Sequence, residues 1–123
     1  MTSISNGLLT ISAKTKGGEL CSLKDANGIE YLWQADPAIW ARHAPVLFPF
    51  VGKLRDDRYK LNGKIFEMPK HGFARETDFS LIKQTPDSLT YQLLPTEKTR
   101  PAYPFEFALT IEYRLNGSAV DIR

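Results

Sequence analysis

Four Asn-Gly pairs constrain the fold of this chain more than any other feature of its sequence. Asn and Gly both tolerate a positive φ, which the two-residue turns of β-hairpins require, so the pair is the strongest short-range signal for a hairpin. The pairs therefore predict short antiparallel strands joined by tight turns. They are Asn6-Gly7, Asn27-Gly28, Asn62-Gly63 and Asn116-Gly117.

Alternation of apolar and polar residues between these pairs also predicts strands. From Phe105 to Leu115 every second residue is large and apolar, which predicts an eleven-residue strand with one buried face. Residues 118–123 form the expected return strand, and residues 89–93 alternate in the same way. An antiparallel all-β protein, a β-sandwich, is the expected fold. Further short strands are expected over residues 8–13, 19–23, 29–33, 59–61, 64–66 and 79–82.

One segment predicts a helical turn instead. Asp36 offers an N-cap carboxylate and Pro37 suits the first position of a helix, so a single turn is expected over residues 36–41. No repeat or linker divides the rest of the chain, and 123 residues suit one domain.

The charge balance argues against a nucleic-acid partner. Sixteen Lys and Arg against fourteen Asp and Glu leave a formal net charge of +2. This is too close to neutrality to indicate binding to a polyanion. A local basic patch of Lys53, Arg55, Arg58 and Lys60 is interrupted by two aspartates and is expected to be a solvated hairpin arm.

Membrane insertion and secretion are not expected either. The longest apolar stretch, residues 44–51, has eight residues with two prolines, whereas a membrane-spanning helix needs about 20. The first residues lack the basic start and apolar run of a signal peptide. The single cysteine, Cys21, cannot form an internal disulfide and is expected to be a buried thiol. These features favour a cytoplasmic protein.

The last expected strand predicts an incomplete sheet. Residues 118–123 would cover only half of the eleven-residue strand before them, so the other half lacks this partner. We expect residues 1–123 to be the amino-terminal part of a longer protein; the alternative is a protein that ends on a short edge strand. In the first case the exposed apolar edge should associate with a second copy or with a partner chain that completes the sheets.

The segment from Trp40 to Arg75 is the least regular part of the sequence. Pro45 and Pro49 bracket an apolar run, and proline is disfavoured in central strands, so this run is expected to cross an edge or mouth of the sandwich. The sequence His71-Gly72-Phe73-Ala74-Arg75 follows in an expected loop, where functional side chains concentrate.

The order and spacing of these motifs resemble the aldose 1-epimerases, the galactose mutarotase-like family. The resemblance is to a bacterial branch with a His-Gly-Phe-Ala-Arg loop, which is also similar to hexose-6-phosphate mutarotases. It rests on residues 44–53 and 69–75, and it extends from residues 17–20 through residues 27–33 to residues 103–105. Family members are considerably longer and fold as a β-supersandwich with the sugar in a cleft. By this resemblance, residues 1–123 match the amino-terminal part of that fold.

The resemblance implies four site residues. His71 takes the place of the family's first active-site histidine, which hydrogen-bonds the sugar near its ring oxygen. Lys53 follows Gly52 where many members carry a sugar-binding arginine; it keeps the charge but lacks the two-pronged grip of a guanidinium. Arg75 matches the loop arginine that helps to hold phosphate in relatives acting on phosphorylated sugars, and Arg42 lies near a second such arginine.

The resemblance further implies an isomerase that interconverts the α and β anomers of a hexose or hexose phosphate without metal or cofactor. Mutarotation needs a base to take the anomeric proton and an acid to protonate the ring oxygen. The family's base, a glutamate, and its second histidine lie in the carboxy-terminal part, so residues 1–123 alone are expected to be inactive. The alternatives are a non-catalytic carbohydrate-binding β-module and a structural β-sandwich whose loops merely resemble the family.

Three other side chains have ordinary structural interpretations. His43 is expected to cap the short helical turn near Asp36. Trp33 and Trp40 could stack on a sugar ring, but tryptophan at a strand end more often belongs to the core. A core position is therefore expected for both.

Overall fold

The structure is a computed structural model that describes all 123 residues of the chain. Its helical elements are two short 3-10 turns, η1 (Arg55–Asp57) and η2 (Ala74–Glu76). No helix has the length and apolarity needed to cross a membrane. The strands are β1 (Thr2–Ser5), β2 (Leu9–Ala13), β3 (Leu20–Asp25), β4 (Arg58–Leu61), β5 (Lys64–Glu67), β6 (Ser80–Gln84), β7 (Ser88–Leu93), β8 (Leu109–Asn116) and β9 (Ala119–Ile122).

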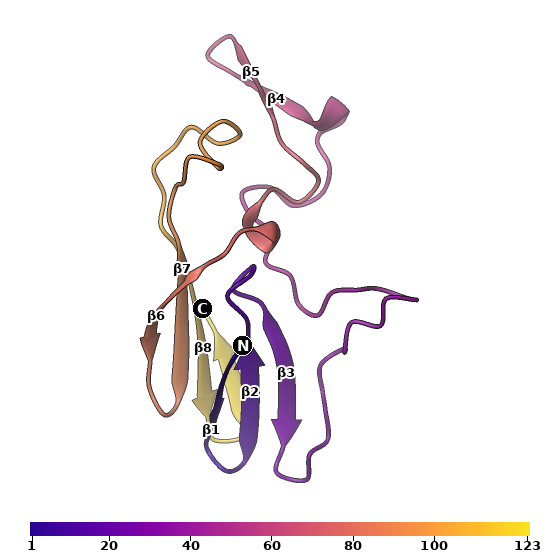
Figure 1. The fold of residues 1–123 in the computed structure, drawn as a ribbon, viewed down its shortest axis with the longest axis vertical. Coiled ribbons are helices and arrows are strands. Elements are labelled where there is room, and N and C mark those ends of the chain that lie inside the picture. Colours follow the sequence, from indigo (N-terminus) through magenta and orange to yellow (C-terminus); the bar gives the residue numbers. More distant parts are fainter.

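Two antiparallel sheets form the body of the molecule (Figure 1). One has the strand order β1-β2-β3 and the other β6-β7-β8-β9, and every pairing within them is antiparallel. The strands β4 and β5 form a separate hairpin that projects away from both sheets. The expected antiparallel β-sandwich is confirmed.

The space between the sheets holds the hydrophobic core. Its side chains come mainly from alternate positions of the strands, as the two-residue period of a strand requires. Two tyrosine hydroxyls cross between the sheets: Tyr91 donates to the Ala13 carbonyl at 3.3 Å, and Tyr113 donates to the Gly18 carbonyl at 2.6 Å. The buried cluster consists of Ile4, Ile11, Ala13, Leu20, Ala74, Phe79, Leu89, Tyr91, Leu93, Ile111, Tyr113 and Leu115.

Asn-Gly turns join neighbouring strands at three places, as predicted. Asn62 and Gly63 have φ values of 49° and 80°, which suit the two-residue turn between β4 and β5. The pair at residues 116–117 joins β8 to β9, and the pair at residues 6–7 joins β1 to β2. The strand β1 is an addition to those expected, because residues 2–5 are too few and too polar to show a period.

The strand expected over residues 29–33 is wrong. Within it only Glu30 forms a bridge, to Lys24. The Glu30 carboxylate accepts hydrogen bonds from the amides of Leu23 and Leu32 at 2.8 and 3.0 Å. This side chain satisfies backbone donors that a neighbouring strand would otherwise take, so the chain leaves the sheet after a single bridge.

The strand expected over residues 105–115 begins later, at Leu109. The strand β7 ends with Leu93, which pairs with Leu109, so the four residues before Leu109 have no strand beside them. Phe107, one of these four, packs on Phe48 with ring centroids 5.1 Å apart. Tertiary packing therefore outweighs the local period in this segment.

The helical turn expected over residues 36–41 is present as a hydrogen-bonded turn. The Asp36 carbonyl accepts hydrogen bonds from the amides of Ile39 and Trp40 at 3.0 and 2.8 Å. Asp36 Oδ1 accepts another from the Ala38 amide at 2.9 Å. The Asp36 side chain thus caps the turn as the sequence indicates.

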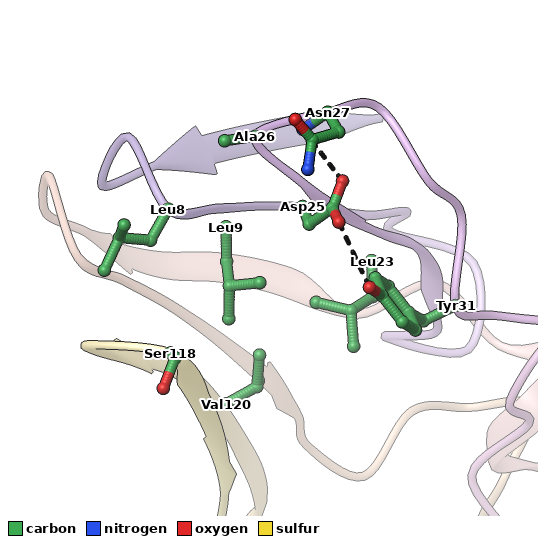
Figure 2. Close-up of a pocket in the computed structure, with 9 residues that line it drawn as sticks. All are labelled: Leu8, Leu9, Leu23, Asp25, Ala26, Asn27, Tyr31, Ser118 and Val120. Atoms are coloured by element: carbon green, nitrogen blue, oxygen red, sulfur yellow. Dashed lines mark hydrogen bonds between the residues drawn. The ribbon is translucent and has the colours of Figure 1, made fainter.

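The sandwich is open between the edges formed by β3 and β9. Two hollows of about 530 and 390 Å³ lie there, and apolar side chains line most of both. In the larger hollow, Leu9, Leu23 and Val120 point into a common space, and the hydrogen-bonded Asp25 and Tyr31 lie at its rim (Figure 2). The two sheets therefore leave apolar surface uncovered along this side.

Candidate functional site

His71 occupies the third position of a tight turn from Pro69 to Gly72. The Gly72 amide donates to the Pro69 carbonyl at 2.9 Å, and His71 has a φ of 68°. A positive φ at this turn position usually requires Gly or Asn. Residues other than Gly and Asn that are held at a positive φ cluster at functional sites. The backbone conformation of His71 therefore makes it a candidate functional residue.

The backbone of Phe48 lies against this turn and binds it by hydrogen bonds. Its carbonyl accepts hydrogen bonds from the amides of Phe73 and Ala74 at 3.0 and 3.2 Å, and Phe48 forms a parallel bridge with Gly72. A Cβ at position 72 would lie only 2.1 Å from the Phe48 carbonyl oxygen. Glycine is therefore required for this approach, and the approach sets the position of His71.

The His71 ring is bound to the chain at Gly52. The Gly52 amide donates to His71 Nδ1 at 2.9 Å, and the His71 amide donates to the Gly52 carbonyl at 2.8 Å. Partial desolvation, together with the positive charges of Arg75 and Lys70, lowers the pKa of His71 below its ordinary value. The protein thus occupies Nδ1, and Nε2 is the ring nitrogen left for a ligand.

His71 lines a cleft of about 450 Å³ between the turn and the irregular segment before it. Trp40, which is 49% exposed, presents an aromatic surface beside the cationic side chains. A few polar groups beside an aromatic or apolar wall are typical of a small-molecule site, and no carboxylate lines this one. The lining residues are Trp40, Pro45, Leu47, Lys70, His71 and Arg75.

The guanidinium of Arg75 is only partly satisfied by the protein. Its Nη2 donates to the Lys70 carbonyl at 3.0 Å. Its Nε is buried without a hydrogen-bond partner, and the Glu76 Oε1 atom lies 3.9 Å away, beyond hydrogen-bond distance. Its Nη1 makes no hydrogen bond within the chain, so this nitrogen retains donors for an anionic or hydroxyl oxygen in the cleft.

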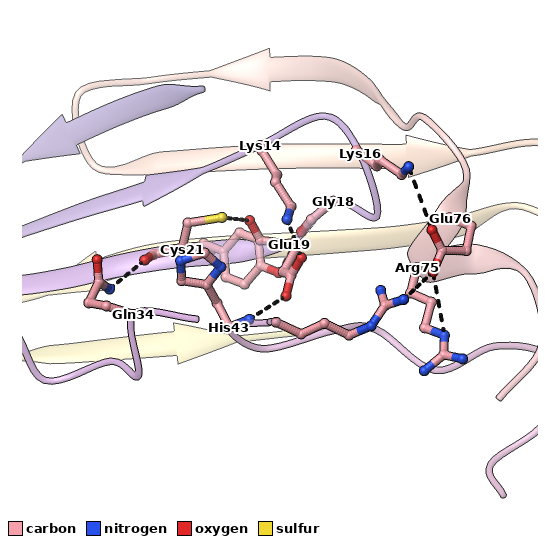
Figure 3. Close-up of polar contacts among 11 residues, drawn as sticks. Lys14, Lys16, Gly18, Glu19, Cys21, Gln34, His43, Arg75 and Glu76 are labelled. Carbon is pink, nitrogen blue, oxygen red and sulfur yellow. Dashed lines mark hydrogen bonds and ion pairs between the residues drawn. The ribbon is translucent and has the colours of Figure 1, made fainter. Parts of the chain in front are cut away.

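Arg42 lies outside the cleft lining but is connected to it through Glu76. Arg42 Nη2 pairs with the Glu76 carboxylate. Lys16 Nζ pairs with the same carboxylate at 3.5 Å (Figure 3). The hydrogen bond from Arg42 and the two positive charges hold the pKa of Glu76 below its ordinary value. Glu76 is therefore ionised, and it links Arg42 to the short turn η2 that carries Arg75.

Lys53 also lies outside the cleft lining. Its ammonium group pairs with Asp57 Oδ2 at 3.5 Å, and both side chains are largely exposed. The structure thus brings His71 and Arg75 together in one cleft and places Lys53 and Arg42 on carboxylates at its periphery.

Glu19 is an organising residue that sequence reasoning missed. It is 2% exposed, and its carboxylate pairs with Lys14 Nζ at 2.6 Å and accepts a hydrogen bond from the His43 amide at 2.9 Å (Figure 3). These contacts tie the segment that leads into the cleft to the sheet containing β2 and β3. The only hint in the sequence is a charged residue at the start of an expected strand.

Two neighbours of Glu19 can be compared with their expected roles. The expectation that His43 caps the helical turn is wrong, because Asp36 caps that turn and His43 Nδ1 is buried without a partner. The expectation of a buried Cys21 thiol is confirmed. Its Sγ donates to the Glu19 carbonyl at 3.2 Å, and burial raises its pKa.

The core position expected for the tryptophans is wrong. Trp33 and Trp40 are 40% and 49% exposed, and Trp33 Nε1 donates to the Trp40 carbonyl at 2.8 Å. The segment that carries them runs outside the two sheets (Figure 1). Trp40 therefore contributes to the cleft instead of the core.

The apolar hollow beside β3 is larger than the His71 cleft but is a weaker candidate for chemistry. Its lining is mainly apolar, whereas the cleft combines a strained histidine, two cations and an exposed aromatic ring. No group of three His, Cys, Asp or Glu side chains is arranged to hold a metal ion.

The fold and the cleft place this protein in the class of galactose mutarotase-like all-β proteins. The family model described as aldose 1-epimerase matches residues 1–123. The chain belongs to the aldose 1-epimerase family.

Relatives share both sequence and structure with this chain. It is 39% identical over 122 residues to the chromosomal protein LacX of Lactococcus lactis subsp. lactis, a match that covers 95% of this chain and 41% of LacX. The galactose mutarotase related enzyme of Lactobacillus acidophilus superimposes with a TM-score of 0.91 at 42% identity, covering 94% of this chain and 39% of that one. A galactose mutarotase-like protein from Lactobacillus casei ATCC 334 superimposes with a TM-score of 0.95 at 35% identity, covering 99% and 42%. The chain thus spans about 40% of the length of these relatives and corresponds to their amino-terminal portion.

Proposed function

We propose that residues 1–123 form the sugar-binding part of a mutarotase site, in a protein that interconverts the α and β anomers of a hexose or hexose phosphate. The observation that carries this proposal is the presence of His71 and Arg75 in one cleft, where Nε2 of the histidine and Nη1 of the arginine make no hydrogen bond within the chain. Membership in the aldose 1-epimerase family supports the class of reaction.

The four residues that family resemblance singles out have distinct places in this proposal. His71 is the catalytic residue and contacts the sugar at its ring oxygen. Arg75 binds a hydroxyl or phosphate oxygen at the wall of the cleft. Lys53 and Arg42 stay predictions as substrate-binding residues, because substrate contact requires them to exchange Asp57 and Glu76 for the sugar.

The reaction needs one group that the cleft does not contain. A base must take the proton from the anomeric hydroxyl while the ring oxygen receives a proton. The ring then opens, the aldehyde rotates, and the ring closes on its other face. No carboxylate lines the cleft, so we assign the base to the carboxy-terminal part of the family fold. Residues 1–123 alone are then inactive, although they bind the sugar.

A non-catalytic carbohydrate-binding β-module is the second candidate. The same observation favours it, because a cleft with donors and no carboxylate can bind a sugar without removing its anomeric proton. Both candidates take a monosaccharide or sugar phosphate as partner. For both candidates we propose a cytoplasmic location, because the single cysteine, Cys21, is free, as is usual in a reducing compartment.

Two measurements on the chain test sugar binding and catalysis separately. Titration of the protein with galactose, glucose and glucose 6-phosphate, followed by NMR, should show binding that His71→Gln removes. The matched control is His43→Gln, because this histidine lies outside the cleft lining and should leave sugar binding unchanged. Polarimetry of freshly dissolved α-anomers should show little acceleration over spontaneous mutarotation.

A longer form, with a carboxy-terminal part like that of the relatives, distinguishes the two candidates. We expect it to accelerate mutarotation and expect His71→Ala to slow it by on the order of a hundredfold, the low end for the loss of a positioned polar group. An inactive longer form that still binds sugar would favour the binding module. Full activity of residues 1–123 alone would contradict the assignment of the base.

A further inference from the structure

The main chain at Gly52 determines how the His71 ring can carry its proton. The amide of Gly52 points at Nδ1 from 2.9 Å, so Nδ1 must present a lone pair. The return hydrogen bond, from the His71 amide to the Gly52 carbonyl at 2.8 Å, holds the two residues in register. A neutral imidazole has one proton, and this geometry leaves only Nε2 to carry it.

We propose that Gly52 is a positioning residue that locks His71 in the neutral tautomer with its proton on Nε2, so that the ring meets a ligand in the cleft only as a hydrogen-bond donor. The ligand part of this inference rests on the proposed function. The tautomer itself does not, because it follows from the contacts of the chain with itself.

Protonation of the ring would break this arrangement. An imidazolium carries a proton on both nitrogens, so Nδ1–H would face the Gly52 N–H and their hydrogen bond would be lost. The charged groups around the ring act in the same direction: Lys70 and Arg75 are cations, and Lys53, next to Gly52, is paired with Asp57. Partial desolvation and these cations lower the pKa of His71 below its ordinary value, which favours the neutral ring.

The lock restricts the chemistry available to His71. A ring with Nδ1 occupied and a proton on Nε2 has no free lone pair, so it cannot accept a proton from a sugar hydroxyl. It can donate to a ring oxygen, to a hydroxyl lone pair or to a phosphate oxygen. His71 is thus a fixed donor, and the proton acceptor of mutarotation must be a different group.

Gly52 can act in this way because of its own conformation. It has a φ of 89°, which side-chain-bearing residues rarely adopt, and a Cβ placed there would meet nothing within 4 Å. A substitution would therefore disturb the direction of the amide without creating a steric clash. This makes Gly52→Ala a test of amide direction and not of packing.

The test is NMR spectroscopy of the ¹⁵N-labelled chain without any sugar. We expect a protonated, pyrrole-type nitrogen at His71 Nε2, an unprotonated, pyridine-type nitrogen at Nδ1, and a scalar coupling between the Gly52 nitrogen and Nδ1 across the hydrogen bond. The His43→Gln variant assigns the signals, because it leaves His71 as the only histidine. A proton on Nδ1, or rapid averaging between the tautomers, would overturn the inference.

A pair of glycine variants tests the role of Gly52. Gly52→Ala should weaken or remove the coupling and admit the second tautomer. Gly63→Ala is the matched control, because Gly63 has a φ of 80°, also meets nothing within 4 Å, and lies in the remote β4–β5 turn. Unchanged His71 signals in a folded Gly52→Ala variant would contradict the role of Gly52. If that variant fails to fold, the coupling between the Gly52 nitrogen and His71 Nδ1 in the unsubstituted chain still shows whether Gly52 donates to the ring.

Addition of sugar separates this inference from the proposed function. Glucose 6-phosphate or galactose should shift the Nε2–H signal while Nδ1 keeps its coupling to Gly52. If the tautomer is locked but the Nε2–H signal responds to no sugar, the proposed function is contradicted and the tautomer assignment is supported. Sugar binding by a ring protonated at Nδ1 would remove the tautomer and leave the proposed function standing.

Discussion

Gly72 and Glu19 show how single residues place the cleft. Gly72 allows the histidine turn to lie directly against the Phe48 carbonyl. Glu19 connects Lys14 on one side with the His43 amide on the other and is itself almost fully buried. Neither residue lines the cleft, but each fixes the position of a segment that does. A buried carboxylate of this kind is tolerated because each contact offsets part of its desolvation.

At this scale we predict that Gly72→Ala is much more destabilising than Gly63→Ala. Both glycines have similar φ values, 71° and 80°, so the backbone strain of alanine is alike. Only position 72 adds a clash, with the Phe48 carbonyl oxygen at 2.1 Å. We expect a loss of roughly 3 kcal/mol in the free energy of unfolding at position 72 and about 1 kcal/mol at position 63, measured by urea denaturation. Equal losses would show that the close approach has no energetic importance.

Among the elements, β8 connects the two sheets most directly. Its Tyr113 lies in the core, and the hydroxyl donates to the Gly18 carbonyl just before β3. Burial raises the pKa of Tyr113 to about 12. The folded state therefore holds the phenolic proton more tightly than the unfolded chain, whose tyrosines titrate near pH 10. Stability from this group is complete below about pH 10 and is lost as the pH rises toward 12.

Tyr113→Phe should test this connection between the sheets. At neutral pH we expect the variant to be about 1 kcal/mol less stable, because the Gly18 carbonyl loses its partner. Between pH 10 and 12 the unsubstituted chain should lose on the order of 2 kcal/mol more than the variant, so the difference between them should shrink or reverse. Urea denaturation across this pH range measures both effects. Parallel stability curves would mean that Tyr113 does not titrate differently on folding.

At the scale of the whole molecule, the open side between β3 and β9 is the most consequential feature. The two hollows there have mainly apolar linings, and β9 presents an unpaired strand edge. Uncovered apolar surface beside a free edge favours association with another chain. We retain as a proposal that a second copy or a partner chain covers this side.

We predict that residues 1–123 self-associate through this side and that Ile122→Asp weakens the association. Ile122 is 61% exposed on β9 and lines one of the hollows. The matched control is Ile65→Asp, because Ile65 is 64% exposed but lies on the β4–β5 hairpin away from the opening. Sedimentation velocity at increasing concentration measures the change. A clean monomer at high concentration, or equal effects of both variants, would contradict the prediction.

Part of the site could be predicted from motifs, and part of it could not. The loop from His71 to Arg75 could be found from the sequence, because it follows the run of residues 44–53 in the order and spacing that resemble the family. The role of Gly52 as the donor to Nδ1 has no signal in the sequence, since it depends on two loops meeting 19 residues apart. The sequence likewise gives no signal for the carboxylate partners of Arg42 and Lys53, although these ion pairs decide whether the two cations reach the cleft.

The sequence by itself determined most of the turns and strands, because these depend on neighbouring residues. Asn-Gly pairs need only their own φ preferences, and alternation needs only one buried face, so β4, β5 and most of β8 follow from local pattern. Residues 29–33 leave the sheet for a local reason, because the Glu30 carboxylate binds the nearby amides of Leu23 and Leu32. Only the tertiary structure decided where β8 begins and why Trp40 faces the cleft. Both outcomes depend on a partner distant in sequence, namely a strand that ends or a sheet that passes elsewhere. Such partners are selected by packing, which no local pattern records.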